Sequence, residues 1–308
     1  MYWLLVLLIV IAVLCIVATV GIYLFTFSYP KSWHTGDFHF PSSPLAQPYK
    51  EQAFKLIESV RERPCKRVYI DSFDGLKLSG RYFEVQKGAP IALCFHGYRS
   101  TAAKDMCGGA TELMNKGMNV LLADQRAHGE SQGSVISFGI NERYDVQSWC
   151  RWAEENFPGT PLILVGVSMG AAMVLLAADL DLPDTLKGIM ADCPYASPRK
   201  IITTVAGYFH IPSWTLIFAI WGAKIFGHFD LSDISAVDTV ARSKVPVLIV
   251  HGLADDFVPE QMSAVIAEKN PGIVTRVTFP GAGHGMSYMV DKEKYVRAMN
   301  SFLDTALK

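Results

Sequence analysis

The sequence has little charge and no basic cluster. Only 19% of its 308 residues are Asp, Glu, Lys or Arg, and the formal net charge is −1. Proteins that bind nucleic acid need a clustered positive field, because contacts to phosphates gain free energy from the counterions they release. Since the chain contains no run of Lys and Arg, we expect no nucleic-acid partner.

Patterns typical of metal sites and disulfide frameworks are also missing. The six cysteines form no CxxC pair, and no cluster of Cys and His has the spacing of zinc ligands. Five of the cysteines lie outside the first apolar segment, and an odd number cannot pair completely, which favours reduced thiols. The sequence therefore predicts neither a bound metal nor a cofactor. The cysteines are Cys15, Cys65, Cys94, Cys107, Cys150 and Cys193.

A long uncharged run begins the chain. Tyr2 to Phe25 contains no charged residue, and as a helix it would be roughly 36 Å long, enough to cross a bilayer. It lacks the basic n-region and small-residue cleavage site of a cleaved signal peptide. We interpret residues 1–27 as a retained single-pass membrane anchor, with a cleaved signal and a buried core helix as alternatives. The flanking charges do not indicate which side of the membrane the rest occupies.

Residues 28–64 are predicted to be a spacer and lead-in. Four prolines lie among aromatic and polar residues between positions 28 and 48, a composition typical of extended chain. We expect the remaining residues, 65–308, to form one folded domain.

That domain alternates short apolar runs with helical patterns. Two alternating segments flank the turn signal Asp74-Gly75 and predict a β-hairpin. The continuous apolar runs that follow predict strands buried on both faces. This order indicates an α/β domain with a mostly parallel, doubly wound sheet, whose strand ends meet along one edge. The predicted strands are 91–95, 119–123, 162–165, 186–191, 247–250 and 274–279, and the predicted helices are 112–116, 142–156, 171–178, 259–269 and 292–306.

A G-x-S-x-G pattern, Gly166-Val167-Ser168-Met169-Gly170, lies between a predicted strand and an alanine-rich helix. In that position the pattern places a serine on a strained strand-to-helix turn with its hydroxyl exposed. Small residues on either side let the helix approach the strand closely. The N–H groups that begin the helix would face a developing oxyanion. Ser168 is therefore the candidate nucleophile.

A serine hydroxyl needs a base to take its proton, and the base needs a carboxylate to orient it. His284 is the candidate base, because it lies between glycines directly after the last predicted strand. Asp255 follows the penultimate strand and is preferred as the acid over Asp256, which we interpret as a solvated neighbour or helix cap. His96, His128 and His251 are interpreted as loop-bracing residues. The other histidines lie in the spacer or in an apolar insertion: His34, His39, His210 and His228.

The order Ser, Asp, His is that of the α/β-hydrolase superfamily. From about residue 65 to 306 the chain resembles that superfamily, and it is most similar to membrane-anchored bacterial hydrolases and to S33/S9-like peptidases. The resemblance rests on His96-Gly97-Tyr98, Asp124–Ser131, Gly166–Gly170, His251–Pro259 and Gly283-His284-Gly285.

The resemblance implies the α/β-hydrolase fold with Ser168, Asp255 and His284 as its catalytic triad. It also implies an oxyanion hole made by the backbone N–H groups of Tyr98 and Met169. The chain departs from many relatives at Ala127, where they have glycine.

An apolar insertion, about residues 195–240, is expected to form a helical cap, where this superfamily commonly has one. A second membrane helix is the alternative, but the uncharged span Ile211–Ala223 is too short for an ordinary crossing. A lid with an apolar underside favours a hydrophobic acyl substrate.

We therefore expect a carboxylesterase- or lipase-like serine hydrolase acting on a small-molecule or lipid-like acyl substrate. One alternative is a serine peptidase or aminopeptidase, for which Asp230, Asp233 and Asp238 are available carboxylates near the cap. A protein thioesterase and a non-catalytic hydrolase-fold binding protein are further alternatives. The sequence does not indicate the oligomeric state.

Overall fold

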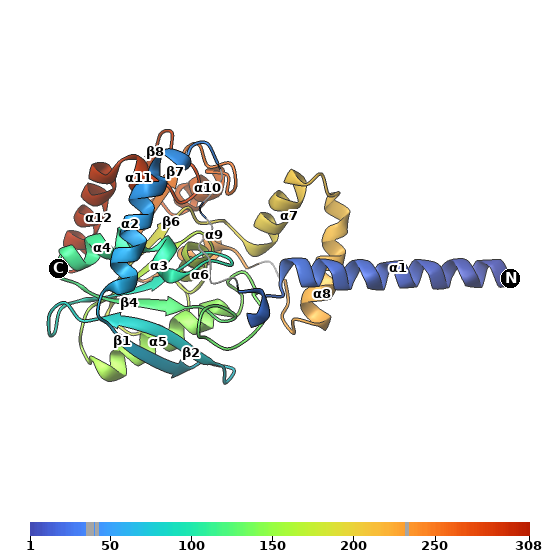
Figure 1. Ribbon diagram of the computed structural model, residues 1–308, viewed down its shortest axis with the longest axis horizontal. Coiled ribbons are helices and arrows are strands. Elements are labelled where there is room, and N and C mark those ends of the chain that lie inside the picture. Colours follow the sequence, from blue (N-terminus) through green and yellow to red (C-terminus); the bar gives the residue numbers. More distant parts are fainter. Residues whose placement is uncertain (35–39, 41–42, 232–233) are drawn as a thin grey trace.

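A sheet of eight strands forms the centre of the molecule (Figure 1). The structure is a computed structural model that describes residues 1–34, 40, 43–231 and 234–308. The strand order is β1-β2-β4-β3-β5-β6-β7-β8. β2 pairs antiparallel with β1 and β4, and the other pairings are parallel. The strands are β1 (Lys66–Asp71), β2 (Lys77–Phe83), β3 (Ile91–Phe95), β4 (Asn119–Asp124), β5 (Leu162–Val167), β6 (Leu186–Asp192), β7 (Val247–Gly252) and β8 (Val274–Phe279).

Helices cover both faces of this sheet, which confirms the predicted α/β-hydrolase architecture. Successive residues of a strand point to opposite faces, so Leu164 packs in one core cluster and Val165 in the other. This is why the central strands are continuous apolar runs. One face packs against α5 (Glu142–Asn156), α6 (Met169–Leu176), α9 (Ala236–Val240) and α10 (Gln261–Lys269). The other packs against α2 (Lys50–Glu62), α3 (Ala102–Asp105), α4 (Cys107–Asn115), α11 (Ser287–Val290) and α12 (Lys292–Ala306).

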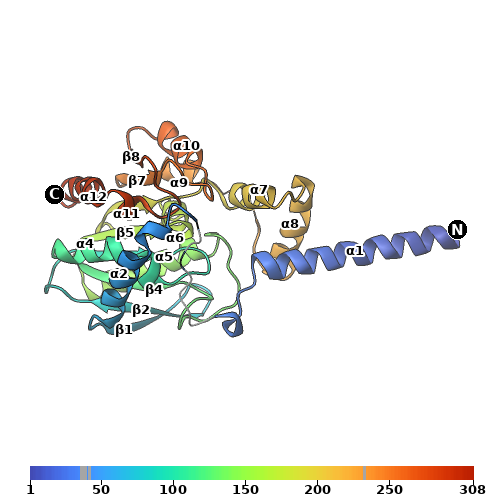
Figure 2. The same cartoon turned by 45° about the horizontal axis from the view of Figure 1, so that its top comes forward.

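The first helix, α1 (Tyr2–Thr26), extends away from the sheet, and its N-terminal end lies far from the body (Figure 1). It is long and apolar enough to cross a membrane. Its last turns lie beside the cap, which consists of α7 (Pro198–Tyr208), the short helix η3 (Ser213–Thr215) and α8 (Leu216–Ile225). The two views agree that α8 runs next to the C-terminal part of α1 (Figure 2).

The segment between α1 and the sheet contacts the domain. Ser28 forms an isolated antiparallel bridge with Val135, and the Tyr29 N–H donates to the carbonyl of Ser134 at 2.7 Å. Near the other end, α2 buries Ile57 and Val60 against α3 and α4. Residues 35–39 and 41–42 of the predicted spacer lie outside the described residues, and its boundaries stay a prediction.

A buried ion pair fixes the loop after β4. The Arg126 guanidinium donates twice to Asp145, at 2.6 and 2.8 Å, and also to Asp74 at 2.9 Å. The side chains of Arg126 and Asp145 are only 5% and 3% exposed. The same loop carries His128, whose Nε2 accepts the Arg99 N–H at 3.0 Å. Arg126 therefore supports the loop that contains Tyr98 and Arg99.

We predict that Arg126→Met lowers the free energy of unfolding by about 3–5 kcal/mol, because Asp145 is left as a buried charge without its partner. Chemical denaturation of the purified protein measures the change. The double variant Arg126→Met/Asp145→Leu should recover most of the loss, since neither charge then remains buried. A single variant as stable as the wild type would contradict this account of the loop.

Candidate active site

Ser168 occupies a strained turn between β5 and α6. Its backbone has φ 56° and ψ −115°, a region that residues with a side chain rarely adopt. The turn is held by the Ser168 N–H, which donates to the carbonyl of Asp192 at 2.8 Å. Because α6 begins at Met169, the hydroxyl lies at the N-terminal end of that helix.

The two glycines of the motif make this turn possible. A Cβ on Gly166 would lie 2.3 Å from the carbonyl carbon of Gly170. A Cβ on Gly170 would lie 2.1 Å from the carbonyl oxygen of Phe95. Both distances are shorter than any van der Waals contact, so only glycine lets α6 approach the ends of β3 and β5.

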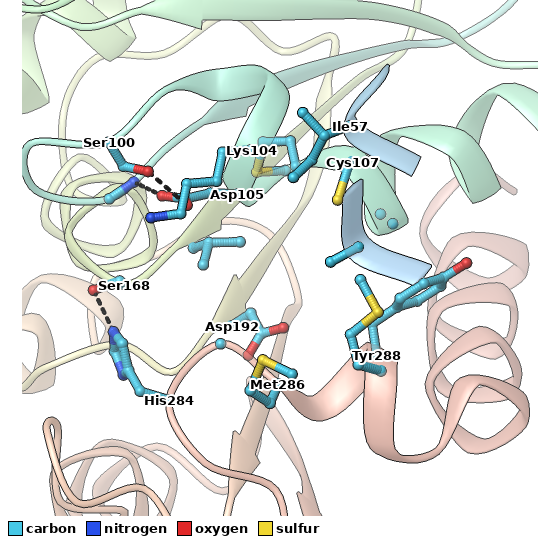
Figure 3. A pocket seen from close by; sticks show the side chains of 18 of the residues that line it. Ile57, Ser100, Lys104, Asp105, Cys107, Ser168, Asp192, His284, Met286 and Tyr288 are labelled. Carbon is cyan, nitrogen blue, oxygen red and sulfur yellow. Dashed lines mark hydrogen bonds between the residues drawn. The ribbon is translucent and has the colours of Figure 1, made fainter. Parts of the chain in front are cut away.

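The structure brings Ser168, His284 and Asp255 together in one hydrogen-bonded chain. His284 Nε2 lies 2.8 Å from Ser168 Oγ (Figure 3), and His284 Nδ1 lies 2.8 Å from Asp255 Oδ2. A carboxylate only accepts, so Nδ1 carries the proton and Nε2 is free to accept the serine proton. The neighbouring Asp256 is exposed, whereas Asp255 is buried.

Asp255 is surrounded by donors. It accepts the backbone N–H groups of Phe257 and Val258 at 3.0 and 2.8 Å. His251 Nε2 lies 3.2 Å from the same oxygen that meets His284. Burial raises the pKa of Asp255, but the bonds from His251, His284 and Val258 outweigh it and hold the pKa well below its usual range. The carboxyl group is therefore ionised at neutral pH.

That negative charge acts on His284. Burial lowers the pKa of the imidazole, but the hydrogen bond and the charge of Asp255 outweigh burial, so the net pKa is raised. Asp192 and Asp105 add smaller contributions in the same direction. An imidazole of raised pKa takes a proton more readily, which is what a general base requires.

The loop after β3 lies directly over Ser168. A Cβ on Gly97 would lie 3.3 Å from Ser168 Cβ. Within the described residues, the N–H groups of Tyr98 and Met169 donate to no protein acceptor. Asp105 holds this loop by accepting the Gly97 N–H and the Ser100 hydroxyl, each at 2.7 Å (Figure 3).

The other histidines are placed elsewhere. His96 is buried, with Nδ1 2.8 Å from the Gly97 carbonyl and Nε2 accepting the Gln125 N–H at 3.2 Å. His128 likewise bonds to backbone through both nitrogens. His210 and His228 are exposed, and His39 lies outside the described residues. His251 differs from the sequence interpretation, because it contacts Asp255 as well as the Val258 carbonyl at 3.0 Å.

Two cavities meet at Ser168. The first, the α2-side cavity, has about 230 Å³ and polar groups from Ser100, Asp105 and Asp192. The second, the α1–cap cavity, has about 270 Å³ and is lined mainly by apolar side chains of α1, α7 and α8. A molecule bound at Ser168 Oγ can therefore place one part in the α2-side cavity, which has polar groups, and the other part in the apolar α1–cap cavity.

Sequence reasoning missed Asp105 and Asp192. Asp192 ends β6, is buried, and has an Oδ1 with no partner in the described structure. Burial raises its pKa to about 6. Its position at the end of a buried strand is a signal that could have identified it, whereas Asp105 lies on a short helix with no motif around it.

Among the residues that the structure describes, one group of side chains has metal-ligand spacing. Ligand atoms of Cys193, Asp255 and His284 lie within 4.8 Å of one another. However, the Asp255 and His284 atoms already bond to each other, and burial raises the pKa of the Cys193 thiol well above its usual value. A neutral thiol is a poor ligand, so these residues do not fit a metal.

Comparisons with known proteins agree on the fold. A family model described as "Serine aminopeptidase, S33" matches residues 87–236. An esterase of Pyrococcus furiosus, Pf2001, superposes with a TM-score of 0.66 at 24% identity, covering 80% of this chain and 92% of that one.

Two sequence relatives cover smaller shares. The uncharacterized protein YqkD of Bacillus subtilis is 29% identical over 194 residues, 62% of this chain and 64% of that protein. A monoglyceride lipase of Mus musculus is 32% identical over 162 residues, 48% of this chain and 52% of that protein. Both matches span less than two thirds of the relative's own length.

We predict that Asp255→Asn lowers the pKa of His284, because burial then opposes the charged imidazole without the carboxylate to offset it. In the wild type the imidazolium persists to a higher pH than in the variant. An NMR titration of the His284 ring protons measures both values, and His251→Phe serves as a companion that keeps the Asp255 charge. An unchanged His284 pKa in Asp255→Asn would contradict the charge coupling.

Proposed function

We propose that this chain, which belongs to the α/β-hydrolase superfamily, is a serine hydrolase that cleaves carboxylic esters with hydrophobic acyl groups. Ser168 is the nucleophile, His284 the general base and acid, and Asp255 the residue that orients His284. The proposal rests on one observation above all, the chain of two 2.8 Å hydrogen bonds through His284 that ends on a strained serine at the meeting point of two cavities.

The geometry supports a two-step acyl transfer. His284 Nε2 takes the Ser168 proton as the hydroxyl oxygen attacks the ester carbonyl, and the Tyr98 and Met169 N–H groups hold the resulting oxyanion. The alcohol leaves with the proton from His284, and Ser168 keeps the acyl group. Water then gives a proton to His284 as it attacks the acyl carbon, and His284 returns that proton to Ser168 Oγ as the bond to the acyl group breaks and the acid is released. Asp255 stabilises the imidazolium in both steps.

The cavities favour an ester over a peptide. A pocket for a free amine needs an accessible carboxylate near the nucleophile. Asp230 and Asp238 are exposed and line neither cavity, and Asp233 lies outside the described residues. Asp105 is hydrogen-bonded to the loop after β3, and Asp192 is buried. The apolar α1–cap cavity instead suits an acyl chain, and an esterase and a monoglyceride lipase are among the similar proteins.

We further propose that α1 anchors the enzyme in a membrane. Its 18-residue apolar window is only 6% buried, whereas a core helix would be covered by its own protein. The site would then operate at a membrane surface, where esters of low water solubility are concentrated.

A fluorophosphonate probe should label the full-length protein at Ser168. We expect Ser168→Ala to abolish labelling and to reduce turnover of a p-nitrophenyl ester on the order of a millionfold, because the nucleophile is absent. Gel fluorescence and ester hydrolysis measure the two effects, and Ser301→Ala, at an exposed serine of α12 that lines neither cavity, is a matched control. Labelling that survives Ser168→Ala would refute the assignment.

An acyl-chain series should favour medium chains over acetyl, because each additional methylene buried in the α1–cap cavity contributes roughly 0.8 kcal/mol. The corresponding amides and thioesters, measured in parallel, separate the esterase from the peptidase and thioesterase alternatives. Higher kcat/KM for acetyl esters or charged peptides would contradict a hydrophobic acyl site.

A further inference from the structure

The apolar cavity at Ser168 is not built by the hydrolase domain alone. Ile22, Phe25 and Thr26 of α1 line it together with side chains of α7 and α8. On the domain side it is closed by Ser168 and Met169, the residues at the nucleophilic turn. A helix that only attaches the domain to a membrane need not line a cavity next to the candidate nucleophile, whereas α1 does.

Close packing fixes α1 against the cap. A Cβ on Gly222 of α8 would lie 2.9 Å from Tyr23 Cβ and 3.3 Å from the Thr19 carbonyl, so the missing side chain lets the helices touch. Ala219 and Ala223, which lie one turn apart on α8 beside Gly222, are also buried. Phe27 joins this contact and is itself completely buried.

The end of α1 also bonds to the loop that carries the proposed oxyanion donor. The Tyr98 hydroxyl donates to the carbonyl of Thr26 at 2.9 Å. The Arg99 guanidinium donates to the carbonyls of Phe25 and Ser28 at 2.9 and 2.8 Å. A cation at a helix C-terminus is favourable because it meets the negative end of the helix dipole and its unpaired carbonyls. The position of the Tyr98 N–H is thus tied to α1.

The cap surface beside α1 is apolar as well. Phe209, Trp214, Trp221 and Ile225 are between 42% and 66% exposed. Soluble domains seldom expose a patch of this kind, and Trp is enriched where proteins meet the headgroup region of a bilayer. With α1 anchored in a bilayer as proposed, the α1–cap cavity would lie close to the bilayer surface, because the last turns of α1 line it.

We propose that α1 is part of the substrate site. Its last turns form one wall of a cavity that receives the acyl chain of a single-chain ester drawn from the bilayer, with the ester carbonyl at Ser168. The volume of about 270 Å³ is just below the usual range for small-molecule pockets, about 300–1,000 Å³, and therefore suits one chain rather than two. The alcohol part then occupies the more polar α2-side cavity. This inference rests on the proposed function.

Substitutions on α1 test whether this helix lines the acyl-chain cavity or only attaches the domain to a membrane. Ile22→Trp fills the cavity, and Leu24→Trp is the matched control, because it lies two residues along, roughly 200° around the helix, and is exposed. Full-length protein is assayed in phosphatidylcholine vesicles with the butanoate and dodecanoate esters of p-nitrophenol. The readout is the ratio of kcat/KM for the two esters, which corrects for a general loss of active protein.

For Ile22→Trp we expect the dodecanoate-to-butanoate ratio to fall at least about tenfold, the effect of excluding about two methylene groups. Leu24→Trp should leave the ratio at the wild-type value. The trimming variant Ile22→Ala should shift the preference toward longer esters, so that a folding failure of one variant does not remove the test. Equal ratios in all four proteins would overturn the inference and make α1 a tether only.

The same assays distinguish a failure of the proposed function from a failure of the role of α1. If wild-type protein hydrolyses neither ester, or hydrolyses them as well after Ser168→Ala, the proposed function fails. If hydrolysis depends on Ser168 but the α1 variants do not alter the ratio, only the role of α1 fails. Hydrolysis of the dodecanoate in detergent solution but not from vesicles would overturn the bilayer as the source of the chain.

Discussion

The close approach of α6 to the sheet is the constraint on which the rest of the site depends. With no Cβ at Gly166 or Gly170, the helix begins within contact distance of the end of β3, and the chain between them must turn through a positive φ at Ser168. Such a conformation costs about 1–3 kcal/mol, which the packing of the wholly buried α6 offsets. The serine hydroxyl therefore has a fixed position before any substrate binds, and the loops after β3, β7 and β8 are arranged around it.

Packing fixes the position of Ser168, and electrostatic interactions fix the charge of Asp255 and the protonation of His284. Asp255 is buried yet ionised because two imidazoles and two backbone N–H groups surround it. Its charge fixes the tautomer of His284 and raises the pKa of the ring despite burial. The carboxylate would be unstable without these donors, and the imidazole would be a weaker base without the carboxylate. The two groups therefore depend on each other, which is why His251, outside the predicted triad, also contributes to the arrangement.

Much of the fold was predictable because its signals are local. The buried strands are uninterrupted apolar runs, and the turn at Ser168 needs glycines at fixed spacing. Both features can therefore be recognised from residues that are neighbours in the sequence. The contacts of Asp105 with Gly97, and of His251 with Asp255, depend on how loops meet in three dimensions. The packing of α1 against α8 could not be predicted from the sequence either. An apolar run of this length has the same composition whether it contacts only lipid or also the cap of its own chain. The roles of the triad and the oxyanion donors stay predictions.

The contact between α1 and the cap constrains how the cap can move. A cap that swings away from the sheet as a rigid body would separate Gly222 from Tyr23, exposing two apolar helix faces at once. In a bilayer that separation is less costly than in water, because lipid chains can replace the lost contacts. For the proposed membrane-anchored enzyme, the bilayer would therefore ease the separation of α1 and α8 as well as hold the site near its substrate.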